Sequence, residues 1–572
     1  MPPRAATAGC GKCYEPDGGF RRSFPLYLLI EEKCESVSRE SSESERVSVM
    51  QCERLVMLRK KFGLSQESMA ERFHVSRQAV QKWENGSSVP DIERLIDIAR
   101  FFNVSLDTLL REEDVRSVDE LRPERDIVPH YQALTDWDLY SSTLRTEYRQ
   151  SLEEGRDVAR YQKVFESVAE LSPDHYKEAL ADVLFNVVKD APQREEYPYN
   201  EPSDLENIRK LRAKTDRTFH PAENLRNRLY GAWIGRISGC ALGKPLEGIR
   251  RGELEKVLKA TGNYPLHRHV RDGELTEEIL GSVTYNLRGR CFADTLDFEP
   301  ADDDTNYTVL GMKLIERHGR DFTPADVADI WVALQPKNAY CTAERVAFRN
   351  FVNGYAPPFS AEYKNAYREW IGAQIRADYF GYVNPGDPET AAEMAWRDAS
   401  ISHVKNGIYG EMLVAAMLAA AACTGDIREV IACGMAEIPA TSRMYEQLAR
   451  LLENVDGGLT YEAWSRDFHS RWDEADPYDW CHVLSNAELV VASLLYGGGD
   501  YAKSICMAVE NGFDTDCNGA TVGSILGMMR GIDGIPEEWY AFFHDTLDTS
   551  IFGAGKVNVA DLVDGTLAHM AK

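Results

Sequence analysis

Apolar residues recur at helical spacing along most of the chain, and the alternating pattern that predicts β-strands is sparse. The segments YTVLGMKLIERHG, AAEMAWRDASISH and YAKSICMAVENG, all after Arg228, show this helical periodicity. Glycines separate such segments or stand inside them, where they allow helices to pack closely. The pattern predicts an all-α protein whose C-terminal part, residues 227–572, is one large helical bundle.

Three further stretches precede this bundle. Residues 1–49 are rich in Ser, Glu, Arg and Gly and are expected to be disordered, and translation is expected to start naturally at or near Met50. Residues 50–113 carry five short helical patterns and predict a small domain. Residues 114–226 are charged and mostly helical in pattern, as in YKEALADVLFNVVKD, and predict a helical spacer packed on a neighbouring domain.

Within the small domain, the segment LSQESMAERFHVSRQAVQKWENG (residues 64–86) has the spacing of a helix-turn-helix. Ala70 is small where two helices must cross closely, and Val75 and Val80 are apolar where the second helix packs. Ser76 stands where a helix N-cap is expected, because its side chain can accept a hydrogen bond from a free backbone N–H of the first turn. The segment therefore predicts two short helices joined by a tight turn.

Through its LSQ start, its SRQAV helix and its WENG ending, this segment resembles the phage-repressor family (Cro/C1, or XRE). In that family the second helix enters the major groove, and its early residues reach base edges. The resemblance implies DNA contacts by Ser76, Arg77, Gln78 and Lys82, with a phosphate contact by Gln66. We expect DNA binding to require a homodimer, because one small module contacts few phosphates. The alternative is a module that binds protein or has lost binding.

Composition restricts the partners. The net charge of -27 argues against nucleic-acid binding over the whole surface, which leaves a local basic face such as the one at residues 59–61. No apolar run approaches the roughly 20 residues of a membrane-spanning helix, so no membrane partner is expected. Twelve cysteines are scattered without a dense disulfide framework, and no secretory signal is seen, which predicts a reducing cytoplasm.

Two groups of aspartates stand far apart in the sequence. PADDDTNYTVL places Asp302, Asp303 and Asp304 at the start of a helix, and GFDTDCNGATVG places Asp514 and Asp516 between glycines. A helix N-terminus favours one carboxylate as a cap, and three in a row exceed that need. Carboxylate oxygens suit hard divalent cations such as Mg²⁺, Mn²⁺ or Ca²⁺. The two groups predict a shared metal site, and an over-acidic helix cap is the alternative for DDDT alone.

A glycine-rich helix supplies the third part. In GAWIGRISGCALGKPLEG, the residues Gly231, Gly235 and Gly239 recur every four positions, and a turn at residues 243–245 leads to Glu247. The three parts, in this order, resemble the ADP-ribosylglycohydrolase family, which includes the dinitrogenase-reductase-activating glycohydrolases. Its members carry G-x-x-x-G-D-A-x-G-x-P-x-E, T-D-D-T and D-T-D-T segments in a large orthogonal helical bundle. The resemblance spans roughly residues 227–572.

In these enzymes two Mg²⁺ ions lie in the helical bundle. The resemblance implies a metal site formed by Asp302, Asp303, Asp304, Asp514, Asp516 and Cys517. Asp302 and Cys517 stand where the family has threonine, and Cys240 stands where it has aspartate. Because a thiol suits Mg²⁺ poorly, Mn²⁺ or a single tightly bound ion is the alternative.

Two further segments, WIGAQIRAD and SISHVKNG, look like the glycine loop and the T-H dipeptide of the family. The resemblance implies that Gly372, Ala373, Gln374 and His403 line an ADP-ribose site and that Trp370 stacks against adenine. For His403 the alternative is a histidine with a purely structural role.

The resemblance implies a metal-dependent glycosidase that hydrolyses an N- or O-ribosyl bond of an ADP-ribosyl group on a protein or on a small molecule. Glu247 and Asp304 are the expected catalytic carboxylates, which deprotonate the attacking water. The fused helix-turn-helix suggests a link to transcription. Two alternatives stay open. One is a regulator that senses ADP-ribose or a related nucleotide through a weakly active or inactive domain, and the other is a hydrolase of small ribosides such as nucleosides.

Overall fold

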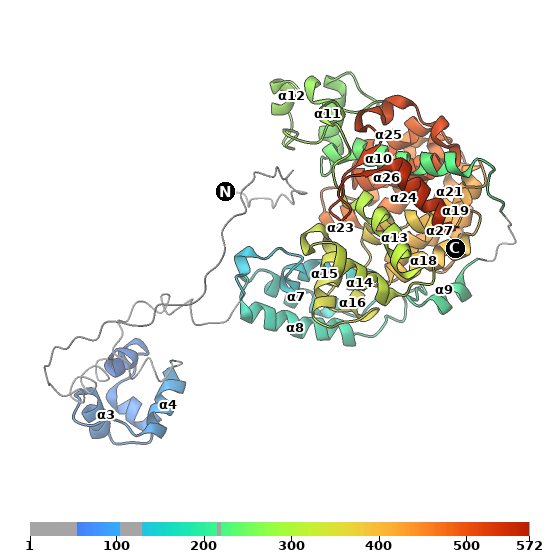
Figure 1. The fold of residues 1–572 in the computed structure, drawn as a ribbon. Coiled ribbons are helices and arrows are strands. Elements are labelled where there is room, and N and C mark those ends of the chain that lie inside the picture. The colour runs from blue at the N-terminus through green and yellow to red at the C-terminus, as the bar shows by residue number, and fades with distance from the viewer. Residues whose placement is uncertain (1–53, 103, 105–128, 214–218, 571–572) are drawn as a thin grey trace, which may run out of the picture. The chain divides into compact units, whose positions relative to one another are not determined.

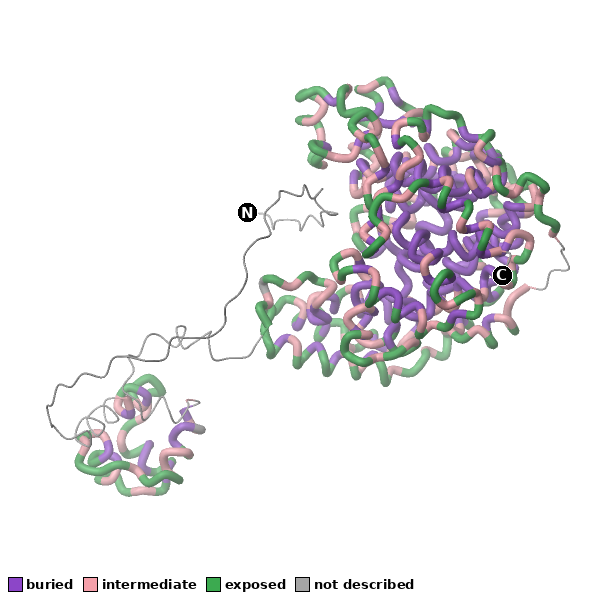
Figure 2. The backbone as a smooth tube through the Cα atoms, viewed as in Figure 1, coloured by how far each residue is buried: buried purple, intermediate pink, exposed green. Residues whose placement is uncertain are grey.

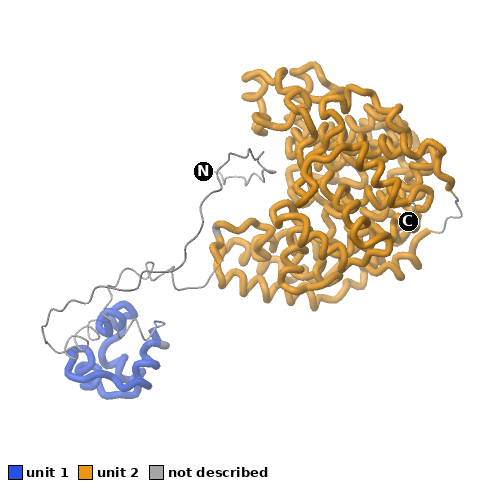
Figure 3. Tube along the Cα trace, in the orientation of Figure 1, with its two compact units in different colours: residues 1–127 blue, residues 128–572 orange. Residues whose placement is uncertain are grey.

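A computed structural model of the 572-residue chain describes residues 54–102, 104, 129–213 and 219–570. The structure is mostly helical (Figure 1), which confirms the predicted fold class. The chain divides into two compact units, residues 1–127 and residues 128–572 (Figure 3). The extension over residues 1–49 and the predicted fifth helix at residues 105–113 lie outside the described residues.

The first unit is a small bundle of short helices with a core of its own. It contains helical residues 54–61, α2 (Gln66–Arg72), α3 (Arg77–Glu84) and α4 (Ile92–Phe102). Ala70 and Val80 are buried in its core, as predicted, together with Trp83 of the WENG segment. The Ser76 hydroxyl accepts a hydrogen bond from the backbone N–H of Ala79, so the predicted N-cap is confirmed.

The second unit contains all the remaining described elements. Its first helices are α6 (Leu144–Glu153), α7 (Gln162–Ala169), α8 (His175–Asp190), α9 (Leu205–Leu211), α10 (Leu225–Gly243), α11 (Arg251–Ala260), α12 (Glu277–Gly281), α13 (Asp303–His318), α14 (Pro324–Leu334), α15 (Thr342–Val352), α16 (Phe359–Glu362), α17 (Asp378–Tyr382) and α18 (Pro388–Ala399). They are followed by α19 (Asn406–Ala421), α20 (Ile427–Ala436), α21 (Arg443–Asp456), α22 (Tyr461–Arg471), α23 (Pro477–Cys481), α24 (Val483–Gly497), α25 (Tyr501–Glu510), α26 (Thr515–Arg530) and α27 (Val559–Met570).

Short 3-10 helices and one hairpin complete this unit. The 3-10 helices are η2 (Tyr131–Ala133), η3 (Tyr140–Thr143), η4 (Ala159–Tyr161), η5 (Lys244–Leu246), η6 (Asp272–Glu274), η7 (Ala293–Thr295), η8 (Lys337–Ala339), η9 (Ile371–Arg376), η10 (Ile532–Gly534), η11 (Glu537–Trp539) and η12 (Ala541–Phe543). The strands β1 (Thr546–Leu547) and β2 (Val557–Asn558) pair antiparallel. Within the part of the chain that the structure describes, every helix is too short or too polar to cross a membrane.

The centre of the second unit is formed by helices that are buried on all sides (Figure 2). Every residue of α19 is buried, and so is every residue of α26 except its last. A helix without a polar face must be surrounded by protein. Alanines and glycines fill both helices, and these small side chains let neighbouring helices approach closely.

Helices α10 and α26 lie in backbone contact. A Cβ atom on Gly235 would lie 2.1 Å from the carbonyl oxygen of Gly523, and one on Gly239 would lie 2.0 Å from that of Gly519. Contacts that run forward along α10 and backward along α26 show that the two helices are antiparallel. The predicted close packing of the glycine helix is thus confirmed. It places the C-terminus of α10 beside the N-terminus of α26.

Residues 129–213 pack on the large bundle within the same unit. Helix α6 buries the polar residues Glu147, Gln150 and Ser151, and Glu154 at its C-cap is buried as well. Arg368 of the bundle donates hydrogen bonds to Glu147, at 2.9 Å, and to Glu154, at 2.6 Å. A charge-assisted network of largely buried side chains therefore joins this segment to the bundle.

Candidate functional site

The first aspartate group opens α13. Asp302 is the N-cap, and its side chain accepts a hydrogen bond of 2.9 Å from the backbone N–H of Asp304. Asp303 and Asp304 occupy the first turn, where the helix dipole favours negative charge. The cap explains one of the three carboxylates, as the sequence suggested, and leaves two for another purpose.

The second aspartate group opens α26. Gly512 and Phe513 have positive φ angles of 75° and 61°, which turn the chain sharply into the helix. Asp514 is the N-cap residue, and Asp516 follows in the first turn. The Thr515 hydroxyl donates a 2.9 Å hydrogen bond to the carbonyl oxygen of Gly243. This bond ties the start of α26 to the end of α10, and so to the turn that carries Glu247.

Carboxylates and thiols from three segments converge at this place. They form three overlapping groups of three, and within each group the possible ligand atoms lie within 4.8 Å of one another. The groups are Cys240–Asp302–Asp304, Asp304–Asp516–Cys517 and Glu247–Asp514–Asp516. Because Asp304 and Asp516 each belong to two groups, the aspartates at 302–304 and at 514–516 lie side by side, as a shared ion requires.

Asp303 belongs to none of these three groups. Its pKa is nonetheless raised well above its usual value, first by burial and then by the charges of Asp302, Asp516 and Glu344. Asp303 and Glu247 are only half-buried, whereas Asp302, Asp304, Asp514 and Asp516 are buried. These two carboxyl groups therefore mark the side of the cluster that faces solvent.

The chemistry of the cluster fits a hard divalent cation. One carboxylate oxygen of Asp304 and one of Asp516 are buried and make no hydrogen bond to any described residue. Burial and the charge of Asp302 raise the pKa of Asp516 to about 6, and burial and the charge of Asp516 raise that of Glu247 well above its usual value. Crowded buried carboxylates of this kind need a positive charge among them.

The two thiols are weaker ligands. Burial and the neighbouring aspartates raise the pKa of Cys240 and the pKa of Cys517 well above that of a free thiol. A protonated thiol is a poor ligand for a metal, because the thiolate is the form that binds. The structure thus places Cys517 in a ligand group without giving it the charge that a strong ligand needs.

Two basic side chains already neutralise part of the cluster. Arg236 of α10 is fully buried and contacts the Asp304 carboxylate and the Asp378 carboxylate at 2.9 Å each. The Lys244 ammonium lies 2.5 Å from the Asp302 carboxylate. Burial alone would raise the pKa of Asp302, but Lys244 holds it below its usual value. Asp302 is therefore an ionised partner of Lys244.

Arg236 is not among the site residues predicted from the sequence, and Lys244 was expected only as part of a turn. A signal for Arg236 was present, because a lone arginine in the glycine-rich, apolar segment GAWIGRISG must find a buried acid. No comparable signal pointed to Lys244, since a lysine beside a proline turn is usually exposed.

Glu299 is a further carboxyl group that the sequence analysis missed. It is 0% exposed, and neither of its oxygens has a hydrogen-bond partner among the described residues. Its backbone is held by the hairpin, since Glu299 N–H donates to Thr546 and Asp548 N–H donates to Glu299. Burial raises the pKa of Glu299 to about 8, against the opposing charge of Lys244. No motif marks this residue, because only the hairpin near the C-terminus holds it there.

Two of the predicted substrate residues, Gly372 and Trp370, adjoin residues that lie beside the cluster. A Cβ atom on Gly372 of η9 would lie 1.9 Å from a carboxylate oxygen of Glu344, whose charge also acts on Asp303. Trp370 forms a β-bridge with His482. The residue before His482 is Cys481, and its sulfur lies 3.9 Å from an oxygen of Asp514. Residues 370–374 are all buried.

Three of the predicted substrate residues have buried polar atoms without a hydrogen-bond partner among the described residues: Trp370, Gln374 and His403, through its Nε2. Both amide atoms of Gln374 and the indole N–H of Trp370 are buried without a hydrogen-bond partner in the described parts of the chain. The His403 ring nitrogen Nδ1 lies 2.9 Å from the Ser402 hydroxyl. Burial and the charge of Arg376 lower the pKa of His403 well below its usual value, so the ring is neutral.

Sequence comparison agrees with this geometry. The model of the family described as ADP-ribosylglycohydrolase matches residues 221–566, more than half of the chain. The chain belongs to the ADP-ribosylglycohydrolase family. A solved ADP-ribosylglycohydrolase-related protein complex aligns with 61% of this family member and with 99% of its own chain, at 18% identity and a TM-score of 0.39.

In the first unit of this family member, α3 presents the predicted DNA-binding residues. Ser76, Arg77, Gln78 and Lys82 are all exposed, while Val80 and Trp83 on the opposite side are buried. An exposed polar face on a short helix that follows a tight turn is the arrangement that enters a major groove. The Ser76 hydroxyl caps α3, so this residue has a structural role in addition to its predicted DNA contact.

Gln66 and one residue of the neighbouring basic patch, Arg59, are engaged within the unit, whereas Lys60 and Lys61 are exposed. The Gln66 amide donates a 2.6 Å hydrogen bond to Glu84, and Glu84 also pairs with Arg59 at 2.5 Å. One amide N–H of Gln66 is thus engaged, and a phosphate contact would use the second. Arg59 is only 13% exposed and therefore adds little to a basic surface.

A helix-turn-helix family model matches residues 55–109. The HTH-type transcriptional activator BcrR of Enterococcus faecalis is 43% identical over 68 residues, which are 12% of this chain and 33% of that protein. The uncharacterized HTH-type transcriptional regulators YqaE and YobD of Bacillus subtilis are 39% identical over 66 residues and 34% identical over 61 residues. The matches cover 12% and 11% of this chain and 57% and 54% of those two proteins.

Proposed function

We propose that this family member is a metal-dependent hydrolase that cleaves the N- or O-glycosidic bond between an ADP-ribosyl group and its acceptor. The convergence of Glu247, Asp304, Asp514 and Asp516 in linked groups carries this proposal. A structural salt-bridge cluster would leave few acid oxygens unpaired, whereas oxygens of Asp304 and Asp516 have no partner among the described residues.

Asp304, Asp514 and Asp516 would hold the cation, with Asp303 on the solvent side and Cys517 as a weak further ligand. Mg²⁺ is the expected ion, two ions are expected from the family, and Mn²⁺ is the alternative. A bound divalent cation would polarise water and the hydroxyl groups of a ribose. Asp302 is a poorer ligand than its position suggested, because Lys244 already binds it.

Glu247 is the proposed general base. Its carboxyl group is half-buried beside Asp514 and Asp516, and its raised pKa makes the ionised form a stronger base than an exposed glutamate. Water oxygen forms a bond to the anomeric carbon and Glu247 takes the water proton. The acceptor atom leaves with the electron pair of the glycosidic bond and receives a proton, which Glu247 or solvent returns. Asp304 is the second proposed catalytic carboxylate. Arg236 holds one of its oxygens in place and leaves the other free to orient the water.

Trp370, Gly372, Ala373, Gln374 and His403 are proposed to bind the ADP-ribosyl group. The unused donors and acceptors of Trp370 and Gln374 favour this role, because buried polar atoms without a partner are rare in a finished fold. Substrate binding would need a small movement, since all five residues are buried.

ADP-ribose release tests the proposal directly. The full chain is assayed with an ADP-ribosylated protein, small ADP-ribose derivatives and nucleosides, in Mg²⁺, in Mn²⁺ and after chelation. Glu247→Gln should lower kcat by about 10²–10⁴-fold without loss of folding, whereas Glu278→Gln, an exposed glutamate on α12, should leave it unchanged. Full turnover by a metal-free sample would refute metal dependence.

We also propose that the first unit binds DNA as a homodimer and that this binding is linked to the hydrolase site. The protonated thiol of Cys517 in a ligand group favours a weakly active domain that senses ADP-ribose. DNA affinity measured with and without ADP-ribose tests the link. An unchanged affinity at saturating ADP-ribose would exclude it.

A further inference from the structure

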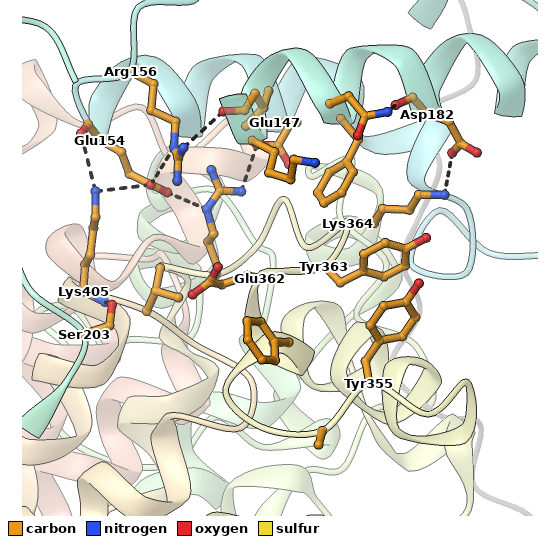
Figure 4. Close-up of a pocket in the computed structure, with 18 of the residues that line it drawn as sticks. Glu147, Glu154, Arg156, Asp182, Ser203, Tyr355, Glu362, Tyr363, Lys364 and Lys405 are labelled. Carbon is orange, nitrogen blue, oxygen red and sulfur yellow. Dashed lines mark hydrogen bonds and ion pairs between the residues drawn. The ribbon is translucent and has the colours of Figure 1, made fainter. Parts of the chain in front are cut away.

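A second site of different character lies where residues 147–203 meet the large bundle. A cavity of about 840 Å³ opens between α6 and α8 on one side and residues 354–368 and 404–405 on the other (Figure 4). This volume is within the range of pockets for small molecules. None of the residues of the acidic cluster lines it. That cluster consists of Cys240, Glu247, Asp302, Asp303, Asp304, Asp514, Asp516 and Cys517.

One part of the cavity is rich in positive charge. Arg368 lies 2.6 Å, Lys405 3.3 Å and Arg156 3.6 Å from the Glu154 carboxylate. Burial raises the pKa of Glu154, but these three cations hold it far below its usual value. One ionised carboxylate thus meets three cations; Arg368 also pairs with Glu147, and the charge of Lys405 also acts on Glu369.

Arg368 keeps a free donor although it is nearly buried. It is 5% exposed, and its Nη2 makes no hydrogen bond to any described residue. The whole lining contains five cations against four acids, in a chain whose net charge is -27. The cations are Arg156, Lys189, Lys364, Arg368 and Lys405, and the acids are Glu147, Glu154, Asp182 and Glu362. Lys189 and Lys364 already pair with Asp190 and Asp182, so the cations that favour an anion are the three gathered around Glu154.

The other part of the cavity is aromatic. Tyr355 and Tyr363 stack with ring centroids 3.9 Å apart and planes 15° from parallel, and Figure 4 shows them side by side on the wall. Phe185 of α8 packs edge-on against Tyr363 at 5.2 Å. Phe359, which also lines the cavity, is 66% exposed. Flat, partly uncovered rings of this kind bind another flat ring.

We propose that this cavity binds a small aromatic anion, with its ring against Tyr355 and Tyr363 and its anionic group near Arg368 and Lys405. A nucleoside monophosphate and an aromatic carboxylate share this chemistry. The opposed charged and aromatic walls favour a ligand that has both features over inorganic phosphate or a neutral nucleoside.

The cavity adjoins the two segments that carry proposed substrate residues. Val404 N–H donates a 3.0 Å hydrogen bond to the carbonyl oxygen of Arg368, so these segments lie side by side. Trp370 follows Arg368 by two positions, and His403 precedes Lys405 by two. A ligand between Arg368 and Lys405 would therefore influence substrate binding. This consequence rests on the proposed function, but binding to the cavity does not.

Calorimetric titration of the full chain tests the proposal. The protein carries Asp516→Asn and is kept in chelator, so that the acidic cluster contributes no metal-dependent binding. The probes are AMP, 4-hydroxybenzoate, adenosine and inorganic phosphate. We expect saturable 1:1 binding of AMP or of 4-hydroxybenzoate, and at least tenfold weaker binding of adenosine and phosphate. Binding of AMP alone identifies a phosphate ligand, and binding of the benzoate alone identifies a carboxylate.

Matched variants locate the binding. Tyr355→Ala should weaken binding about tenfold, the effect of removing a stacking partner, and Lys405→Gln should weaken it by a similar factor. Tyr176→Ala and Lys210→Gln, exposed and outside the lining, should leave it unchanged. Binding of neither anion, or equal binding by the Asp516→Asn protein with and without Tyr355→Ala, would overturn the proposal. Neither result would bear on hydrolysis, which is measured separately with metal.

Discussion

At the scale of single residues, the acidic cluster contains buried acids that pair with a basic side chain and buried acids that do not. Arg236 and Lys244 bind Asp304 and Asp302, which lie at the start of α13. The carboxylates that open α26 have no such basic partner among the described residues. The side of the cluster formed by Asp514 and Asp516 is therefore where a cation gains most, since attraction grows where charges are buried and unpaired.

Asp516→Asn tests this view by thermodynamics. In chelator the variant should be as stable as the unaltered protein or more stable, because one charge is removed from a crowded, buried group. At a Mg²⁺ concentration 100-fold above Kd the unaltered protein should gain about 2.7 kcal/mol, and the variant should lose most of that gain. Thermal unfolding with and without Mg²⁺ measures both effects. Asp329→Asn, an exposed residue of α14, is the control, and equal Mg²⁺ stabilisation of the Asp516 variant would contradict the site.

Glu299 predicts a pH dependence of stability in the metal-free protein. Its folded-state pKa of about 8 lies above the value of about 4.3 expected in the unfolded chain. A raised folded pKa contributes stability at low pH that is lost as the pH rises between these two values. The unaltered protein should therefore lose roughly 1 kcal/mol per pH unit relative to Glu299→Gln between pH 5 and pH 8. Unfolding of both proteins in chelator provides the measurement, and parallel pH profiles would show that Glu299 does not titrate in this way.

At the scale of elements, one helix pair positions the site. Glycines at every fourth position of α10 and α26 bring the two backbones into contact, and that contact sets Gly243 against Thr515. Ridge-forming side chains would separate the helices to the usual 8–10 Å between axes. With wider spacing, Glu247 would move away from Asp514 and Asp516, and the acidic groups would separate.

Gly235→Ala should disrupt this pair. The added methyl group would meet a backbone oxygen at 2.1 Å, and backbone atoms in the middle of a helix cannot move aside. We expect a loss of about 3 kcal/mol or more in the free energy of unfolding, or a failure to fold, measured by denaturant titration and soluble yield. Gly252→Ala on α11, with open space around it, should be neutral or stabilising by up to about 1 kcal/mol. A loss below 1 kcal/mol for Gly235→Ala would show that the helices can separate at little cost.

At the scale of the whole molecule, the two units have separate hydrophobic cores. The acidic cluster belongs entirely to the second unit, and the exposed face of α3 belongs to the first. Substitutions in one unit should therefore leave the local properties of the other unchanged. Any influence between them would have to appear as a coupling between DNA affinity and ligand binding.

Gln78→Ala and Lys82→Ala test the predicted DNA contacts of α3 and the independence of the two units. With a duplex selected from a random DNA pool, the Gln78 variant should bind about tenfold more weakly and lose preference at one base position, because a paired contact to a base is lost. Lys82→Ala should weaken binding of all duplexes and reduce the salt dependence, as expected for a phosphate contact. Both variants should keep the Mg²⁺ stabilisation of the unaltered protein. Unchanged DNA affinity of both variants would show that α3 is not the helix that contacts DNA in the major groove.

Much of the architecture was predictable because local chemistry determined it. Helical periodicity, the serine cap at Ser76 and the glycine spacing at Gly231, Gly235 and Gly239 each act over a few residues, and each was confirmed. The aspartates could be assigned to two motifs for the same reason, because each motif spans only a few residues. The pairing of Asp302 with Lys244 could not be predicted, because it joins residues 58 positions apart in sequence.

The sequence by itself thus determined which segments are helical, where two helices can touch and which residues carry acid groups. Only the tertiary structure decided which of those acids face a basic side chain and which keep a free oxygen. It also placed Glu299 near them without a hydrogen-bond partner for its side chain among the described residues. It also decided that residues 147–203 close a charged and aromatic cavity against the bundle. The physical reason is that hydrogen bonds and ion pairs depend on distances of a few ångströms between atoms, and distant segments reach those distances only when the whole chain has packed.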